Sequence, residues 1–331
     1  MMTLIEELIE KAKKSPKRVA LPECDAEKTL LAAKRVLDEK IGTPVLVSDP
    51  AVIAETAKAA GVSTEGMEIV DCTDEAAADA LVERYWKEDM LISAKACKRK
   101  IKNPMYYAMM LEAVGDVDCT FCGHVNTTGD VLMAASTIIG MQEGVDVPSI
   151  FALCEIPGFE GPEGNRICFS DCGLNPEPTP SELASIAIAS ADNIKALMGW
   201  EPRVAFLSFS TCGSGAATSV DRIVEALEIA KKRRPDLKID GEFQLDAAID
   251  PAVAAKKVPR ESEVAGKANI LIFPELNAAN IAVKMMQKFA HGSGYGHTLS
   301  GFAKPVADSS RGASVEEIVG DIAMVILAAS K

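Results

Sequence analysis

Short runs of β-branched and apolar residues alternate with longer amphipathic stretches along most of the chain. The runs predict strands at residues 18–22, 44–48, 117–122, 203–209 and 269–273, and the stretches between them predict helices that include 26–38 and 51–60. Several runs are apolar throughout, which is typical of strands that are buried on both faces. Strands separated by helices of about ten residues or more pair in parallel, as βαβ units. The pattern therefore predicts an α/β fold with mostly parallel sheets.

The middle of the chain has a different pattern. Residues 149–155 and 166–170 flank a turn rich in glycine and proline, PGFEGPEGN, which predicts an antiparallel hairpin. Farther along, Thr179 and Glu182 have the spacing of a capping box, with proline at the first helical position. They predict a helix that begins there and ends at Gly199.

Composition and charge narrow the class of protein. A chain of 331 residues with 48% hydrophobic and 25% charged residues is ordinary for a globular protein of two domains or one large one. The net charge of −13 disfavours a nucleic acid or an anionic membrane as partner, but it does not exclude an anionic small molecule. The first predicted helix is amphipathic, unlike an export signal, and no apolar run approaches the roughly 20 residues of a membrane span. With nine cysteines in no secretory pattern, we expect a soluble, cytoplasmic protein with reduced thiols.

The C-terminal region carries the pattern richest in chemistry. Strand-like residues give way to a loop that contains Ser309, Ser310 and Arg311, and the loop leads into a helix. Free amides at the start of a helix, two hydroxyls and a guanidinium together are typical of a phosphate-binding site. The alternative is a plain helix cap, because Ser314 and Glu317 have capping-box spacing. A cation at the start of a helix opposes the helix dipole, so Arg311 favours the anion site.

Two further loops follow predicted strands. The segment GHVNTTG at 123–129 lies where open α/β sheets bind ligands, although Thr127 and Thr128 could equally cap the next helix. The segment GSGAAT at 213–218, with Asp240 beyond it, resembles a dinucleotide-binding turn. Thr218 stands where that motif requires glycine or alanine, so we interpret the segment as a tight turn at the mouth of a substrate cleft.

Other motifs are weak. Cys119 and Cys122 have the spacing of metal ligands, but no second pair matches them, and residues three apart in a strand point to opposite faces. None of the three histidines, His124, His291 and His297, forms an evident nucleophile–base pair with a serine or cysteine. We therefore expect neither a metal centre nor a catalytic triad.

Several blocks, in the right order, resemble the phosphate acetyltransferase (phosphotransacetylase) family, within the phosphate acyltransferases. The most specific blocks are residues 103–107, 207–211, 234–242, 270–274 with 276–277 and 280–281, and 303–305 with 310–312. The resemblance implies two three-layer αβα domains like those of isocitrate and isopropylmalate dehydrogenases, with the active site in the interdomain cleft. One domain would combine residues 1–145 with 300–331, and residues 146–299 would form the inserted second domain. The family also implies a homodimer that acts on CoA or acetyl-CoA, phosphate and acetyl phosphate, with no bound cofactor.

The resemblance also implies roles for individual residues. Ser310 and Arg311 would hold and polarise the acyl phosphate, and Glu317 would be the base for the CoA thiol. Arg84, which from its spacing alone is a surface residue of a helix, would meet the phosphate. Further substrate contacts are expected from three polar residues of the 123–129 loop and one residue of the C-terminal loop: Asn126, Thr127, Thr128 and Ser309.

The chain departs from the family pattern at several positions. Met133 and Cys212 stand where the family has basic residues, Asn126 replaces a histidine, His297 replaces a proline, and Glu317 replaces an aspartate. Loss of one charge-assisted contact costs roughly 1.5–3 kcal/mol, so these departures leave the acyl specificity open.

These observations together predict a phosphate acetyltransferase. The reaction would be acetyl-CoA + phosphate ⇌ acetyl phosphate + CoA, by direct attack in a ternary complex, which requires no nucleophile from the enzyme. One alternative is a phosphate acyltransferase for propionyl or butyryl groups. Two others are a decarboxylating dehydrogenase of the same fold, and a paralogue without activity that is kept for binding or assembly.

Overall fold

The computed structural model describes residues 2–90, 92–296 and 298–330, so His297 lies outside the described residues. The chain forms two compact units. Unit 1 consists of residues 1–140 and 302–331, and unit 2 consists of residues 141–301. Each unit is described by itself below.

Unit 1 is built on a parallel sheet in the order β3-β2-β1-β4-β12. Its strands are β1 (Arg18–Leu21), β2 (Thr43–Ser48), β3 (Glu68–Asp71), β4 (Cys119–Cys122) and β12 (Val306–Asp308). The last strand comes from the C-terminal part of the chain and pairs with β4, so that Asp308 lies opposite Cys122. Consequently the two loops that the sequence singled out, after β4 and after β12, begin side by side.

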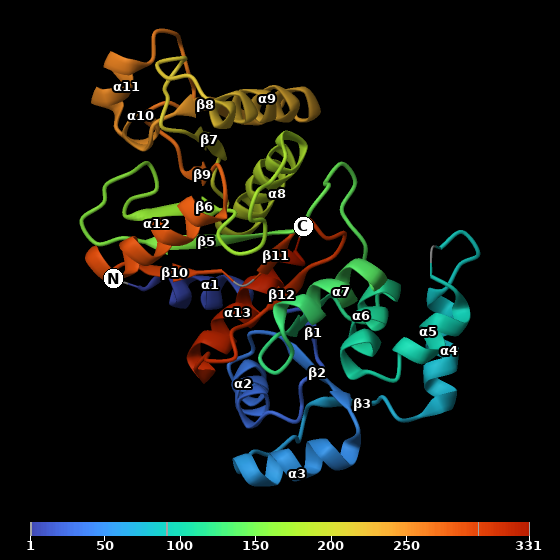
Figure 1. Ribbon diagram of the computed structural model, residues 1–331. Helices are drawn as coiled ribbons and strands as arrows, with labels where there is room; N and C mark the ends of the chain where they lie inside the picture. Colours follow the sequence, from blue (N-terminus) through green and yellow to red (C-terminus); the bar gives the residue numbers. More distant parts are fainter. Residues whose placement is uncertain (1, 91, 297, 331) are drawn as a thin grey trace. The chain divides into compact units, whose positions relative to one another are not determined.

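The helices of unit 1 cover both faces of this sheet. They are α1 (Leu4–Ala12), α2 (Glu27–Asp38), α3 (Pro50–Ala60), α4 (Glu75–Tyr85), α5 (Ala94–Lys100), α6 (Pro104–Val114), α7 (Thr128–Ile138) and α13 (Val315–Ala328). Figure 1 shows α2 and α13 on one side of the strands and α6 on the other. Every residue of α13 from Ile318 onward is buried, and the helix packs against α1 and α2. The C-terminal helix therefore belongs to the core and fixes the turn that precedes it.

Unit 2 is built on a mixed sheet in the order β11-β5-β6-β9-β7-β8, and β10 also pairs with β5. Its strands are β5 (Ser149–Glu155), β6 (Arg166–Ser170), β7 (Arg203–Leu207), β8 (Lys238–Phe243), β9 (Ile270–Ile272), β10 (Ser293–Tyr295) and β11 (Thr298–Ser300). The predicted antiparallel hairpin is confirmed as β5 and β6. From β6 to β8 the pairing is parallel, as the apolar strand pattern predicted.

The helices of unit 2 are α8 (Pro180–Met198), α9 (Thr218–Arg233), α10 (Leu245–Ile249), α11 (Pro251–Lys257) and α12 (Leu276–Phe289). The predicted capping box begins α8, and Gly199 ends it in the left-handed conformation, with φ 72°. Among the described residues, no helix combines the length and the apolar character that a membrane crossing requires.

Candidate active site

The carboxyl ends of three neighbouring strands define one edge of the sheet in unit 1. Because β1, β4 and β12 are parallel and adjacent, the loops that follow them leave from the same edge. Open α/β sheets bind their ligands at such an edge. The loop after β1 contains Glu23, the loop after β4 contains His124, and the loop after β12 contains Ser310.

Glu23 organises the loop after β4. Its side chain is buried, and one carboxylate oxygen accepts hydrogen bonds from the backbone amides of Gly123 (3.0 Å) and Asn126 (2.8 Å). The same oxygen accepts a bond from Asn126 Nδ2 (2.7 Å), and the other oxygen accepts the His124 amide (2.7 Å). Carboxylates that accept backbone amides form short, strong bonds. The single side chain of Glu23 therefore holds residues 123–126 in one conformation.

Gly123 allows the loops after β4 and β12 to approach closely. It has φ 89°, and a Cβ atom there would lie 2.1 Å from Asp308 Oδ1 and 2.7 Å from the Ser309 amide nitrogen. No other residue fits this position without moving the strand pair, because contacts below about 3 Å involve overlap of atoms. The Ser309 amide instead donates to the Cys122 carbonyl oxygen (2.8 Å), which continues the pairing beyond the strands.

The residues 309–312, which we call the Ser310 turn, connect β12 to α13. Ser309 is buried, and its hydroxyl donates to Asp321 Oδ2 of α13 (3.2 Å). Ser310 is exposed, and its hydroxyl accepts the Gly312 amide (3.3 Å). His124 Nδ1 lies 3.2 Å from the Ser310 carbonyl oxygen, so the two loops are in direct contact. The structure thus brings Ser309, Ser310 and the loop after β4 together.

Arg311 is exposed at the tip of the Ser310 turn. Within the described part of the chain it has no hydrogen-bond or ion-pair partner, unlike most arginines of this protein. A second cation lies near it, because Lys28 of α2 donates to the carbonyl oxygen of Ala313 (2.8 Å). An uncommitted guanidinium beside exposed hydroxyl and amide groups is suited to bind an oxyanion.

Three polar residues at the loop after β4 were expected to contact the substrate, and the side chains of all three make hydrogen bonds within unit 1. Asn126 is bound to Glu23, and Thr127 is the N-cap of α7 in a capping box with Asp130. The Thr128 hydroxyl donates to Asp308 Oδ2 (2.7 Å). The capping alternative is therefore confirmed for Thr127, while Thr128 joins its helix to the end of β12.

Glu317 occupies the capping position that its spacing allowed. Its Oε2 accepts the backbone amide (2.8 Å) and the hydroxyl (2.9 Å) of Ser314, and its own amide donates to the Ser314 hydroxyl (3.2 Å). A reciprocal cap of this kind satisfies two amides at the start of a helix. Of the two roles that the sequence left open for Glu317, the structure supports the helix cap.

Asp321 lies one turn beyond Glu317 and was not singled out from the sequence. Its side chain is buried beneath the Ser310 turn, and burial raises its pKa to about 8, with further upward contributions from the charges of Glu317 and Asp308. The hydrogen bond from Ser309 acts in the opposite direction. At neutral pH the carboxyl group beneath the turn is therefore mostly protonated, and adds little negative charge to an anion site.

Arg84 is not brought to this edge. It lies in the last turn of α4, and its two terminal nitrogens bind the two carboxylate oxygens of Asp116 (2.7 and 2.6 Å). Asp116 precedes β4, and its carbonyl oxygen accepts a bond from Arg18 at the first residue of β1 (2.9 Å). Arg84 therefore lies at the amino edge of the parallel sheet, opposite to the edge that carries the Ser310 turn. It borders a cavity of about 690 Å³ there, together with Lys87 and Lys304.

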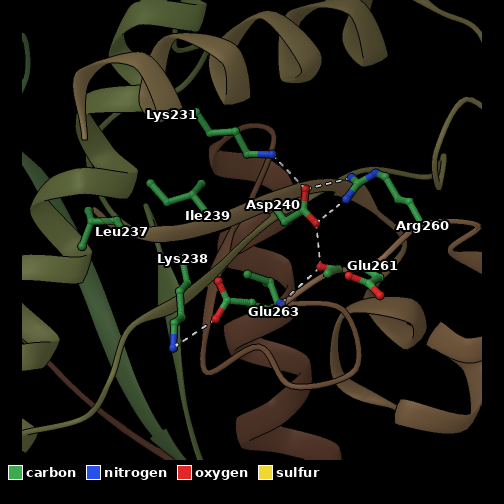
Figure 2. A pocket seen from close by; sticks show the side chains of 10 residues that line it. Lys231, Leu237, Lys238, Ile239, Asp240, Arg260, Glu261 and Glu263 are labelled. Carbon is green, nitrogen blue, oxygen red and sulfur yellow. Dashed lines mark hydrogen bonds and ion pairs between the residues drawn. The ribbon is translucent and has the colours of Figure 1, made fainter. Parts of the chain in front are cut away.

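Asp240, the acidic residue of the apparent dinucleotide motif, is already neutralised in unit 2. Figure 2 shows it at a cavity of about 570 Å³, where Arg260 binds it through two nitrogens (2.6 and 2.8 Å). Lys231 (3.1 Å) and the Ser262 hydroxyl (2.6 Å) complete its shell. Burial acts to raise the pKa of Asp240, but the bonds from Arg260 and Ser262 leave it below its usual value. Asp240 is therefore engaged by half-exposed cations and is not a free acceptor for a ribose.

The glycine turn at 213–218 is likewise held by a carboxylate. Glu242 is buried, and its Oε1 accepts the Gly213 amide (2.8 Å) and the Ser210 hydroxyl (2.7 Å). The first amide of this turn, that of Gly213, thus points at a glutamate instead of outward to a phosphate. Unit 2 therefore provides no support for a nicotinamide site at this motif.

The two positions where the resemblance expects basic residues differ in their surroundings. Met133, on α7, is 61% exposed. Cys212 is partly buried with φ 51°, and burial raises the pKa of its thiol. Among the described residues, no group of three or more histidine, cysteine, aspartate or glutamate side chains is arranged to hold a metal ion.

Comparisons with known proteins agree with this architecture. The family described as phosphate acetyl/butaryl transferase matches residues 3–326. The phosphate acetyltransferase of Clostridium acetobutylicum is 40% identical over 332 residues, covering 100% of this chain and 99% of the relative. A crystal structure of a phosphotransacetylase from Streptococcus pyogenes superposes with a TM-score of 0.88 at 31% identity, over 99% of both chains.

A more distant structure, 4-hydroxythreonine-4-phosphate dehydrogenase from Klebsiella pneumoniae, superposes with a TM-score of 0.55 at 10% identity. It covers 95% of this chain and 100% of the other, and it shows a shared fold alone. The predicted dehydrogenase-like α/β fold is confirmed, as is the resemblance inferred from the sequence blocks. The chain therefore belongs to the phosphate acetyl/butaryl transferase family.

Proposed function

We propose that this protein is a phosphate acetyltransferase, which reversibly converts acetyl-CoA and phosphate to acetyl phosphate and CoA. The observation that carries the proposal is the Ser310 turn, where the exposed guanidinium of Arg311 has no partner among the described residues. Full-length similarity to the phosphate acetyltransferase of Clostridium acetobutylicum supports the same reaction.

Charge is the main requirement of this chemistry. Acetyl phosphate is an anion, and attack on its carbonyl carbon places further negative charge on the carbonyl oxygen before phosphate departs. Arg311 and the Ser310 hydroxyl would bind the phosphate, and the amides at the start of α13 would face the developing charge. Lys28 adds a positive charge at the same turn. The proposal gives no phosphate contact to Arg84, because its guanidinium is bound to Asp116 at the other edge of the sheet.

The cysteine thiols near the site favour direct attack by the CoA thiol over an intermediate bound to the enzyme. Cys24 and Cys122 are the nearest cysteines along the three loops, and both are buried. Burial raises the pKa of Cys24 to about 12 and that of Cys122 well above its usual value. A thiol that stays protonated is a poor nucleophile, so an acyl–cysteine intermediate is disfavoured. The reaction would therefore proceed in one ternary complex, in which the enzyme positions the two substrates.

The proposal extends to the state of the protein in the cell. We propose a cytoplasmic homodimer that uses CoA, acetyl-CoA, phosphate and acetyl phosphate as substrates and holds no metal or cofactor. All nine cysteines are unpaired, in keeping with a reducing compartment. Family membership supports the choice of substrates.

A longer acyl group is the closest alternative, because the matching family includes both acetyl and butaryl transferases. The test is release of free thiol from acetyl-CoA, propionyl-CoA and butyryl-CoA, each with and without phosphate. Phosphate-dependent release that is fastest with acetyl-CoA supports the proposal. Preference for butyryl-CoA would show that the acyl group is wrong, and CoA binding without any release would identify a paralogue that has lost the activity.

A further inference from the structure

His124 is held beside the Ser310 turn both through its backbone and through its ring. Its backbone amide donates to Glu23, and its Nδ1 lies 3.2 Å from the Ser310 carbonyl oxygen. A carbonyl oxygen only accepts, so this contact is a hydrogen bond when Nδ1 carries the proton. The neutral ring then has its lone pair on Nε2, the nitrogen that points away from the Ser310 carbonyl.

Four carboxylates around the turn have other partners, whereas Asp25 of the loop after β1 is exposed. Glu317 caps α13 through Ser314, and Glu23 accepts four hydrogen bonds from residues 123–126. Asp308 accepts the Thr128 hydroxyl, and Asp321 is buried against Ser309. A proton acceptor for a thiol has to reach the substrate with a free lone pair. His124 is half-buried and its ring contacts the Ser310 turn directly, so a lone pair on Nε2 can lie beside a substrate bound at that turn.

Resting on the proposed function, we propose that His124 is the general base of the reaction, with Nε2 accepting the proton of the CoA thiol. The sulfur forms a bond to the acetyl carbonyl carbon, and the bond between that carbon and the phosphate oxygen then breaks. The electron pair of the broken bond stays on the phosphate oxygen, and the imidazolium returns its proton to the departing phosphate. In the opposite direction the same ring donates a proton to the leaving thiolate.

Two substitutions distinguish a role of His124 as general base from a role that only anchors the loop through its bond to Ser310. His124→Asn places an amide nitrogen near the position of Nδ1, so it can keep the bond to Ser310 but has no group at the position of Nε2. His124→Ala removes both. General-base catalysis contributes about 10²- to 10⁴-fold. We therefore expect both variants to lose about 100-fold or more in kcat, with the KM values for acetyl phosphate and CoA changed by only about threefold or less.

Added imidazole provides a readout that a structural role would not change. It should restore part of the rate of His124→Ala, whose missing ring leaves room, and should do less for His124→Asn. The matched control is His291→Asn in unit 2, a position with φ 53° that asparagine tolerates, and we expect it to keep the wild-type rate.

The possible outcomes are distinct. A His124→Asn variant with nearly normal kcat would show that the ring serves only as an anchor, and a His124→Ala variant that does not respond to imidazole would also overturn the proposal. Wild-type protein is assayed first with all three acyl-CoAs. If it releases no thiol with any of them, the proposed function itself fails, and the role of His124 fails with it.

Discussion

Replacing Glu23 with glutamine tests whether one buried carboxylate holds the loop that carries His124. The substitution keeps the size and shape of the side chain but provides only one accepting oxygen. If that oxygen takes the place of Oε1, it keeps the amides of Gly123 and Asn126 and the Asn126 side chain. The new NH₂ group then faces the amide of His124, which loses its acceptor.

The magnitude follows from these contacts. An unmade bond to a charged acceptor costs roughly 1.5–3 kcal/mol, and the three remaining bonds weaken because their acceptor is neutral. Since His124 is only half-buried, water can satisfy part of its amide, and we expect a local destabilisation of about 2–3 kcal/mol. This corresponds to opening of the loop that is about 30- to 150-fold more frequent.

Hydrogen exchange measured by mass spectrometry on peptides that cover residues 119–130 reports this opening directly, because exchange of protected amides follows the local opening equilibrium. The control is Glu27→Gln on the exposed first turn of α2, which should leave these peptides unchanged. Turnover of Glu23→Gln should fall together with the loss of protection. An exchange rate within about threefold of wild type would refute the reasoning, because it would show that Glu23 is dispensable for the loop.

Three further predictions concern pH, the two arginines and the missing basic residue. Burial raises the pKa of Asp321 in the folded state from its ordinary value of 3.8 to about 8, so the folded state keeps a proton that the unfolded chain loses, and stability falls as pH rises from about 4 to 8. Urea unfolding at pH 5 and pH 8 should show a smaller loss of stability for Asp321→Asn, and the remaining loss is due to buried Glu112, whose pKa burial also raises to about 8. Arg311→Ala should raise the KM for acetyl phosphate by about tenfold or more, whereas Arg84→Ala, which breaks an exposed ion pair, should change it by less than about twofold. Met133→Arg should lower the KM for CoA by about two- to fivefold, and Met133→Gln should not, as measured by initial rates.

Most of the fold could be predicted from local patterns. The hairpin of β5 and β6, the capped start of α8 and the parallel strands follow from spacing and turn chemistry alone. The strand ends were less well predicted, because pairing rather than apolar character decides them. β4 begins at Cys119 and not at residue 117, and β7 ends at Leu207, two residues before the predicted end.

For the site residues too, local contacts were easier to predict from the sequence than contacts across the fold. For residues whose role depends on neighbours a few positions away, such as Thr127 and Glu317 at helix starts, the spacing offered capping as an alternative to a role in the site, and the structure shows the caps. Contacts between residues far apart in the chain were not predicted. Glu23 meets the loop after β4 about a hundred residues later in the chain, and Arg84 finds Asp116 after 32 residues. No periodicity in the sequence encodes such a pairing, so an arginine that resembled a phosphate ligand is found in an ion pair.

Buried carboxyl groups lie directly behind a turn that is proposed to bind an anion, which at first sight opposes its function. The contacts of Glu23 and Asp321 show two different ways in which the repulsion of an anion is reduced. Four donors surround Glu23, so its charge is balanced by the dipoles of the loop that it orders. Asp321 is kept protonated by burial, so it can satisfy Ser309 without repelling a phosphate. Arg311, Lys28 and the start of α13 supply positive charge and dipoles at the Ser310 turn. When Asp321 ionises above about pH 8, its charge is added directly beneath the turn, so affinity for acetyl phosphate should weaken there in the wild type and not in Asp321→Asn.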